Sequence, residues 1–198
     1  LYGEYMEQDN KKYTGKLFSN TDLKLLIVPL IIEQFLAIAV GMSDTVMVSF
    51  AGEAAVSGVS LVDMVNNVLI SLLAALATGG AVVISQFIGA RKNDDACTAA
   101  AQLEIMTFSV SVIISILVII FAHPLISMLF GNIDNEVFEA SKQYLTITAI
   151  SFPMLAIYNS GAAIYRSIGD SKTSMKVSIL MNIINVVGNS VGIFVLHM

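Results

Sequence analysis

The chain has 198 residues, of which 56% are hydrophobic and 13% are charged, and its mean hydropathy is +0.80. A soluble domain usually carries about 25% charged residues, so the composition argues against a soluble enzyme. Ten Lys and Arg residues are spread along a chain of net charge −5, and this pattern argues against a nucleic-acid partner. Cys97 is the single cysteine of the sequence, which excludes a disulfide within it and a metal site built from cysteines.

Five apolar stretches are long enough to cross a bilayer as helices, which takes about 20 residues each. They lack the alternation of apolar and polar residues that marks the strands of a membrane barrel. The sequence therefore predicts an all-α, polytopic membrane helical bundle. The expected spans are residues 25–48, 54–79, 96–122, 144–165 and 173–196, and the second apolar stretch continues to residue 88.

Residues 1–22 are polar and are predicted to be a cytoplasmic tail rather than a signal peptide, because no short apolar core with a cleavage site follows them. With five spans, nine of the ten basic residues fall on the same side of the membrane as this tail, and Lys142 is alone on the other. Basic residues mark the cytoplasmic side, so the N-terminus is expected inside. The first residue is Leu1 rather than Met, and the chain is expected to be a fragment.

The first span contains Glu33, Gln34 and Asp44, although an ionisable residue at the centre of a bilayer costs roughly 2.5–3.5 kcal/mol. At 100° per residue the two acids share one helix face, about 16 Å apart along the axis. Pro29 is expected to loosen this helix near its inner end. Two interpretations of the acids stay open. They border a wet, functional chamber, or they are structural, with Asp44 buried or in the outer headgroup zone.

Two other spans carry polar residues at helical spacing, and each row defines one helix face. The row of the second span is Ser60, Asp63, Asn67 and Ser71, and that of the fifth span is Ser178, Asn182, Asn185 and Asn189. Amide oxygens suit a hard cation or a hydrogen-bonded relay to a carboxylate. Hydrogen bonding between packed helices is the alternative, and Gly188 with Gly192 forms a GxxxG pattern that favours close approach.

The remaining polar residues inside the spans are Glu104 in the third and Tyr158 with Asn159 in the fourth. The sequence has no phosphate-binding loop, no His/Cys cluster and no nucleophile motif, so neither an enzyme nor an ATP-driven pump is expected. We also expect no resident metal and no organic cofactor.

Four segments follow one another in a distinctive order. The first is Pro29, Glu33-Gln34 and GMSDTVMV at 41–48, and the second is GEAAVSGVS at 52–60. The third and fourth are Gln86-Phe87-Ile88-Gly89-Ala90-Arg91 and Arg166 with Gly169-Asp170, the latter similar to an RxxGD(T/S) turn. In this order, and on the sides that the charge rule predicts, they resemble the N-terminal part of the multidrug and toxic compound extrusion (MATE) family. The resemblance runs from about residue 23 to the end.

The resemblance implies twelve helices in two six-helix lobes with a substrate cavity between them, so five helices of the N-lobe are expected here and the C-lobe is missing. It implies a secondary active multidrug exporter of the bacterial inner membrane that exchanges cationic or amphipathic compounds for Na⁺ or H⁺. It maps the N-lobe coupling acid onto Asp44 and its partners onto Asn185 and Asn189. Some members have an acid at the position of Asn189.

Under this hypothesis the other polar positions receive roles as well. The substrate cavity is expected to be lined by Glu33, Gln34, Asp63, Asn67, Tyr158, Asn159 and Asn182. Pro29 is the expected helix hinge, and the cytoplasmic turn motifs comprise Gln86, Gly89, Arg91, Arg166, Gly169 and Asp170. The expected partners are the lipid bilayer, the drugs and the missing C-lobe.

Two alternative functions stay open. One is a lipid-linked saccharide flippase of the same superfamily, for which a more basic cavity is expected. The other is a non-transporting membrane assembly protein, whose polar rows are packing seams.

Overall fold

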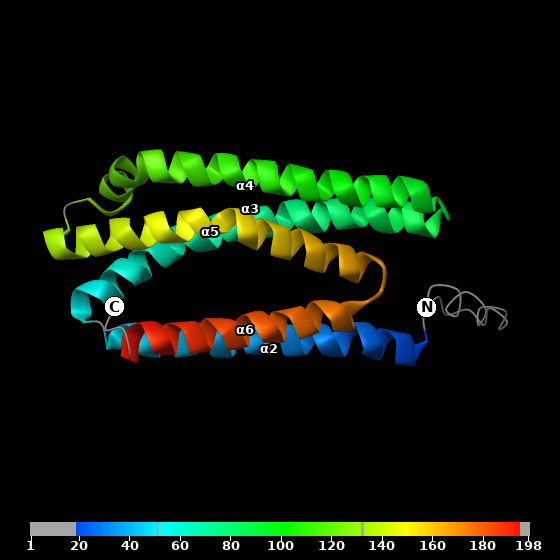
Figure 1. The fold of residues 1–198 in the computed structure, drawn as a ribbon, viewed down its shortest axis with the longest axis horizontal. Coiled ribbons are helices and arrows are strands. Elements are labelled where there is room, and N and C mark those ends of the chain that lie inside the picture. Colours follow the sequence, from blue (N-terminus) through cyan, green and yellow to red (C-terminus); the bar gives the residue numbers. More distant parts are fainter. Residues whose placement is uncertain (1–18, 51, 132, 195–198) are drawn as a thin grey trace.

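The computed structural model describes residues 19–50, 52–131 and 133–194, and these ranges contain five α-helices and no strand. The prediction of an all-α helical bundle is confirmed. The helices, labelled as in Figure 1, are α2 (Asn20–Ser49), α3 (Glu53–Gly89), α4 (Asn93–Phe130), α5 (Asn135–Ser167) and α6 (Ser171–Phe194).

The helices are longer than the expected spans. α3 continues past residue 79 through Gly80 to Gly89, because the apolar stretch runs on to residue 88 and contains no proline. α2 begins at Asn20, so the last residues of the predicted tail are helical, whereas residues 1–18 of that tail lie outside the described residues. The last two residues of the predicted fifth span, 195 and 196, also lie outside them.

Ser19 caps the N-terminus of α2 in a capping box. The Thr21 backbone N–H donates to Ser19 Oγ at 3.3 Å, and the Ser19 N–H donates to Asp22 Oδ2 at 3.0 Å. The helix then passes through Pro29 without interruption, and Pro29 is the one residue of α2 that is buried. A proline inside a helix removes a backbone hydrogen bond, so the predicted weak point is present in a continuous helix.

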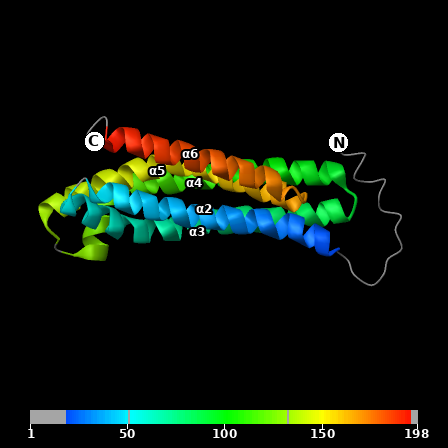
Figure 2. The same cartoon turned by 90° about the horizontal axis from the view of Figure 1, so that it is seen from below.

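Two groups of helices are distinguishable in Figure 1: a bundle of α3, α4 and α5, and a pair formed by α2 and α6. The view in Figure 2 shows all five running along the same long axis. The bundle contains the main hydrophobic core, formed by Val62, Leu73, Val118, Ala122, Ile126, Leu145, Ala149, Phe152 and Ala156. Neither core cluster contains a buried residue of α2 or α6. From residue 171 to 191, where the burial of α6 is described, its buried residues are three serines near its start, Ser171, Ser174 and Ser178.

The connections alternate between the two ends of the molecule. The turns α3–α4 and α5–α6 lie at the end where α2 starts, and the other two connections lie at the opposite end (Figure 1). Arg91, Lys92, Arg166 and Lys172 therefore share one end, which is the expected inner end. We use "inner" and "outer" for these two ends below.

Four of the described helices, α2 to α5, are long and apolar enough to cross a membrane. The fifth expected span, 173–196, runs past the described residues and stays a prediction. α6 lies against α2 along much of its length (Figure 1).

Candidate functional site

The outer half of the α2–α6 pair joins a carboxylate to two amides. Asn189 of α6 donates from Nδ2 to Asp44 Oδ1 of α2 at 2.8 Å and to Asn185 Oδ1 at 3.2 Å. Asn185 and Asn189 are four residues apart and so lie on one face of α6. Neither of the two ion pairs among the described residues involves Asp44. The structure thus brings the three predicted coupling residues together, with a carboxylate that has no cationic partner in the described part of the chain.

The GxxxG pattern beside the amide row does not form a close-packed seam at Gly188. Gly188 is exposed, and a Cβ added there meets no atom within 4 Å. The close helix approach that the GxxxG pattern favours is therefore absent at Gly188. The contact at this level between α2 and α6 is instead the polar one at Asp44.

A second acid of the outer half belongs to the bundle. The Tyr144 hydroxyl of α5 donates to Asp63 Oδ1 of α3 at 3.1 Å. Asp63 and Asp44 are near enough for their charges to interact, and Tyr144 lies within electrostatic range of both. Sequence reasoning did not select Tyr144. Its four-residue spacing from Thr148, which binds Asn66 of α3, is the signal that marks this polar face of α5.

On α3, Asn66 faces the neighbouring helix α5, and Asn67 does not. Asn66 is buried and donates from Nδ2 to Thr148 Oγ1 at 3.3 Å. Asn67, the predicted cavity residue, is exposed on the surface, as is Gln34 of α2. Asn67 and Gln34 make no side-chain hydrogen bond within the described ranges, so both are available to groups outside them.

The inner half of the pair has its own polar cluster, built around Glu33. Arg166 of α5 pairs through Nη1 with Glu33 Oε1 at 3.5 Å, and Ser174 of α6 donates to Glu33 Oε2 at 3.2 Å. Arg166 Nη1 also donates to Ser174 Oγ at 3.2 Å, and Tyr158 lies beside Glu33. Glu33, predicted as a cavity acid, therefore already has an internal cation as its partner.

The RxxGD turn connects α5 to α6, and each of its motif residues has a separate task. Gly169 has a φ of +85°, a left-handed conformation that glycine adopts without strain. Asp170 caps α6 by accepting from the Thr173 backbone N–H at 3.1 Å and from its hydroxyl at 2.6 Å. The hydrogen bond from the Thr173 hydroxyl lowers the pKa of Asp170, and nearby Lys176 acts in the same direction. Arg166 lies in the last turn of α5 and pairs with Glu33.

The other motif that was predicted to be cytoplasmic lies at the α3–α4 turn. Gln86, Gly89 and Arg91 are exposed, and Arg91 has a φ of 60°. The Lys92 backbone N–H donates to the Phe87 carbonyl at 3.0 Å and closes the turn. None of the three motif side chains contacts the Asp44 or Glu33 clusters within the described chain.

Two of the predicted cavity residues have buried amide groups without a partner. The Nδ2 atoms of Asn159 in α5 and Asn182 in α6 are buried and make no hydrogen bond within the described residues. Glu104, by contrast, accepts a hydrogen bond from Ser160 at 2.7 Å inside the bundle. No group of three or more His, Cys, Asp or Glu side chains that suits a metal ion occurs in the described ranges.

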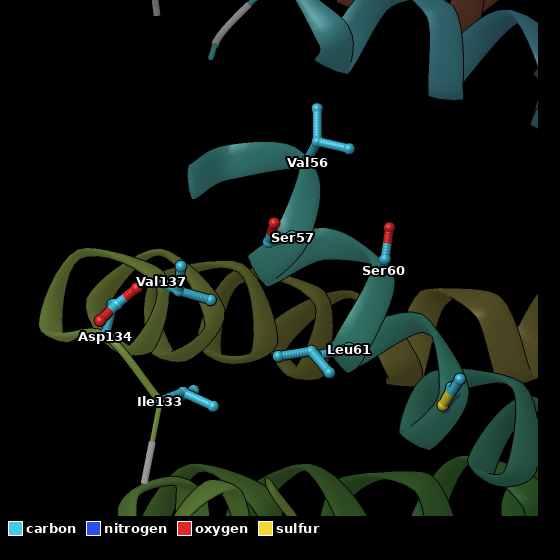
Figure 3. A pocket seen from close by; sticks show the side chains of 8 residues that line it. Val56, Ser57, Ser60, Leu61, Ile133, Asp134 and Val137 are labelled. Atoms are coloured by element: carbon cyan, nitrogen blue, oxygen red, sulfur yellow. The ribbon is translucent and has the colours of Figure 1, made fainter. Parts of the chain in front are cut away.

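Two hollows occur on the described residues, and only the smaller one includes a predicted cavity residue. The larger, of about 570 Å³, is a shallow depression at the outer end of α3. Figure 3 shows Ile133, Asp134 and Val137 on one side of it and α3 residues on the other. None of the predicted cavity residues borders it. The smaller, of about 170 Å³, lies between α5 and α6 and includes Tyr158.

Comparison with known sequences and structures gives consistent matches. The chain is 34% identical over 185 residues to an uncharacterized transporter, YisQ, of Bacillus subtilis. The matched region covers 93% of this chain and 39% of the relative. It is 27% identical to a probable multidrug resistance protein, NorM, of Halalkalibacterium halodurans, covering 91% of this chain and 38% of the relative. The chain thus spans less than two fifths of the length of these curated relatives.

Solved structures share the fold. A structure titled as MATE in the straight conformation is 26% identical, with a TM-score of 0.80 over 88% of this chain and 38% of its own. A transporter of the MOP superfamily from Pyrococcus furiosus, 24% identical, has a TM-score of 0.83 over 88% of this chain and 38% of its own. The helices described above therefore have the fold of the N-terminal part of these transporters. A sequence model of the MatE family matches residues 29–191, and the chain belongs to this family.

Proposed function

We propose that the chain supplies the ion-coupling site of a secondary active exporter, which expels cationic or amphipathic compounds in exchange for Na⁺ or H⁺. The observation that carries this proposal is the contact of Asp44 with Asn189 and Asn185 across α2 and α6. A carboxylate and two amides are hard-oxygen ligands of the kind that Na⁺ or a proton can use. No organic cofactor is part of the proposal.

Ion binding at this site would change the contact between the two helices. Asn189 Nδ2 now donates to the Asp44 carboxylate. A proton on Asp44, or a Na⁺ beside it, removes the charge that this hydrogen bond favours, and a Na⁺ requires amide oxygens rather than N–H groups. The hydrogen bond is therefore weaker in the occupied state, and an ion that binds the two states with different affinity shifts the equilibrium between them.

The movement proposed to follow uses α2. Pro29 interrupts the hydrogen bonding of this helix, so a change at Asp44 can be absorbed there. A shift of α2 alters the space that it borders and favours drug release. Alternating access around a fixed midplane site is the general pattern of secondary transporters.

Cationic substrates are favoured by the charges inside the helices. Glu33, Asp44, Asp63 and Glu104 are acids inside the expected spans, whose one basic residue is Lys176, near the start of the fifth. Arg166, just past the fourth span, is already paired with Glu33. Exposed Gln34 and Asn67, together with the unpaired amides of Asn159 and Asn182, are proposed to meet substrate in a cavity shared with a second lobe. The proposed setting is the bacterial inner membrane, with the N-terminus in the cytoplasm.

The test uses the Asp44→Asn variant in the protein expressed from its complete reading frame. Ethidium efflux from energised membrane vesicles is measured with a Na⁺ gradient and, separately, with a proton gradient. We expect loss of ion-driven efflux, because the amide cannot carry the charge that attracts the ion. Glu139→Gln, which removes an exposed acid at the same end, is the matched control and is expected to leave efflux unchanged. Undiminished efflux by Asp44→Asn would remove the role assigned to Asp44.

A further inference from the structure

The register of α2 against α6 is set by polar contacts rather than by an apolar core. Pro29 is the one buried residue of α2, and from residue 171 to 191, where the burial of α6 is described, its buried residues are serines. Both hydrophobic core clusters of the described chain are built from α3, α4 and α5. Without interlocking apolar side chains, two parallel helices can slide or tilt unless directional contacts hold them.

Two polar contacts supply this hold, one in each half. The outer one joins Asp44 to Asn189, and the inner one joins Glu33 to Ser174 and Arg166. Glu33 and Asp44 lie on one face of α2, about 16 Å apart along its axis. A change in position at Glu33 is therefore transmitted along a rigid helix face to Asp44.

The inner contact is held by the turn between α5 and α6, residues 166–174, which is called the corner below. Gly169 lets the chain reverse immediately after α5, and Asp170 caps α6 through two hydrogen bonds from Thr173. Arg166 sits in the last turn of α5 and Ser174 in the first turns of α6, so this corner holds both partners of Glu33 in place. Ser174 is buried, and the Glu33 side chain is only 12% exposed.

We propose that Arg166, together with Ser174, is a positioning group for the ion-coupling site. By holding Glu33, it fixes the register of α2 on α6, and this register brings Asp44 to within hydrogen-bond distance of Asn189. Arg166 contacts neither Asp44 nor the ion and acts through Glu33. This inference rests on the proposed coupling role of Asp44.

The experiment measures the dependence of ethidium efflux on the driving ion in proteoliposomes containing the transporter expressed from its complete reading frame. For Arg166→Gln we expect the Na⁺ concentration, or the proton concentration, at half-maximal efflux to rise by about tenfold, as is typical when a group that orients a ligand is removed. The KM for ethidium is expected to change less than twofold. Arg166→Lys, which keeps the charge, is expected to recover part of the loss.

A milder variant and a control complete the design. Ser174→Ala removes one hydrogen-bond donor of Glu33 without changing any charge, and it is expected to produce a smaller rise in the same quantity. If Arg166→Gln does not reach the membrane, this variant decides the question. Lys172→Gln removes an exposed positive charge from the first turn of α6 and is expected to leave ion dependence unchanged.

The opposing outcome is a fall in the maximal rate with unchanged half-saturation by the ion in both Arg166→Gln and Ser174→Ala. That result would mean a purely structural contact and would overturn the proposal. If Asp44→Asn abolishes ion-driven efflux while these variants keep wild-type ion dependence, only this inference fails. If Asp44→Asn has no effect, the proposed function fails and this inference with it.

Discussion

The α3–α4–α5 bundle and the α2–α6 pair use different interactions to hold their helices together. In the bundle, apolar side chains from three helices interlock around Val62, Leu145 and Phe152, each no more than 1% exposed. Gly58 adds a close backbone approach, since a Cβ there would lie 2.9 Å from the Ser141 backbone nitrogen. The pair has no such core and is joined by two polar clusters. Close packing is rigid, whereas isolated hydrogen bonds in a membrane contribute about 0.6 kcal/mol each.

This difference indicates which part of the molecule moves. Elements that change position during function come from the less stable parts of a structure. The bundle is suited to act as a fixed frame, and the pair carries both the candidate ion site and the proline. The comparison can be tested by weakening each part separately.

The largest effect on stability is expected in the bundle. Phe152→Ala leaves a cavity in the core, and the free energy of unfolding is expected to fall by about 3 kcal/mol. Ile184→Ala in α6 removes a side chain that is 59% exposed and is expected to cost less than about 0.5 kcal/mol. Thermal unfolding in detergent, followed by far-ultraviolet circular dichroism, compares the two. Equal losses would contradict the division into a frame and a weakly held pair.

The sequence predicted which residues share a face of one helix better than it predicted which residues of different helices are in contact. Periodicity placed Glu33 and Asp44 on one face, and the family resemblance placed Asn189 opposite Asp44, where the structure has it. It did not predict that Arg166 meets Glu33, because 133 positions separate them and periodicity does not say which faces meet. The charge rule assigned Arg166 to a cytoplasmic turn, and this left its partner unidentified.

The polar residues of α3 show a second limit of prediction from spacing alone. Asn66 and Asn67 lie three and four residues after Asp63, and either spacing can place a residue on the same side of a helix as Asp63. The partner decides between them: Thr148 of α5 binds Asn66, and Asn67 is left exposed. Tyr144 was missed for the same reason, since its role depends on Asp63 in another helix.

A smaller effect is expected at the corner that joins the bundle to the pair. Gly169→Ala places a Cβ on a residue with a φ of +85°, which costs roughly 1–2 kcal/mol. Gly161→Ala, in the interior of α5 with no atom within 4 Å of the added Cβ, is the matched change and is expected to stabilise by roughly 0.5–1 kcal/mol. Thermal unfolding of the two variants should therefore shift in opposite directions. Shifts of the same sign would show that this corner is not a constrained element.

The smallest effect concerns the cap of α6 and its dependence on pH. Because the pKa of Asp170 is lowered in the folded protein by its bonds with Thr173, the folded state takes up this proton less readily than the unfolded chain does. The cap therefore stabilises the protein above the ordinary pKa of 3.8, and this contribution is lost as pH falls through the lowered folded value. Asp170→Asn provides a cap that does not titrate.

Between about pH 6 and pH 3 the wild type is thus expected to lose roughly 0.5 kcal/mol more stability than Asp170→Asn, a small figure because Asp170 is only partly buried and its charge is screened by solvent. Chemical unfolding at several pH values measures the difference. Parallel pH profiles would show that Asp170 contributes no titrating cap. The corner that positions Arg166 and Ser174 would then depend on Gly169 and on the buried serines instead, and the α2–α6 register would be insensitive to acid at this end.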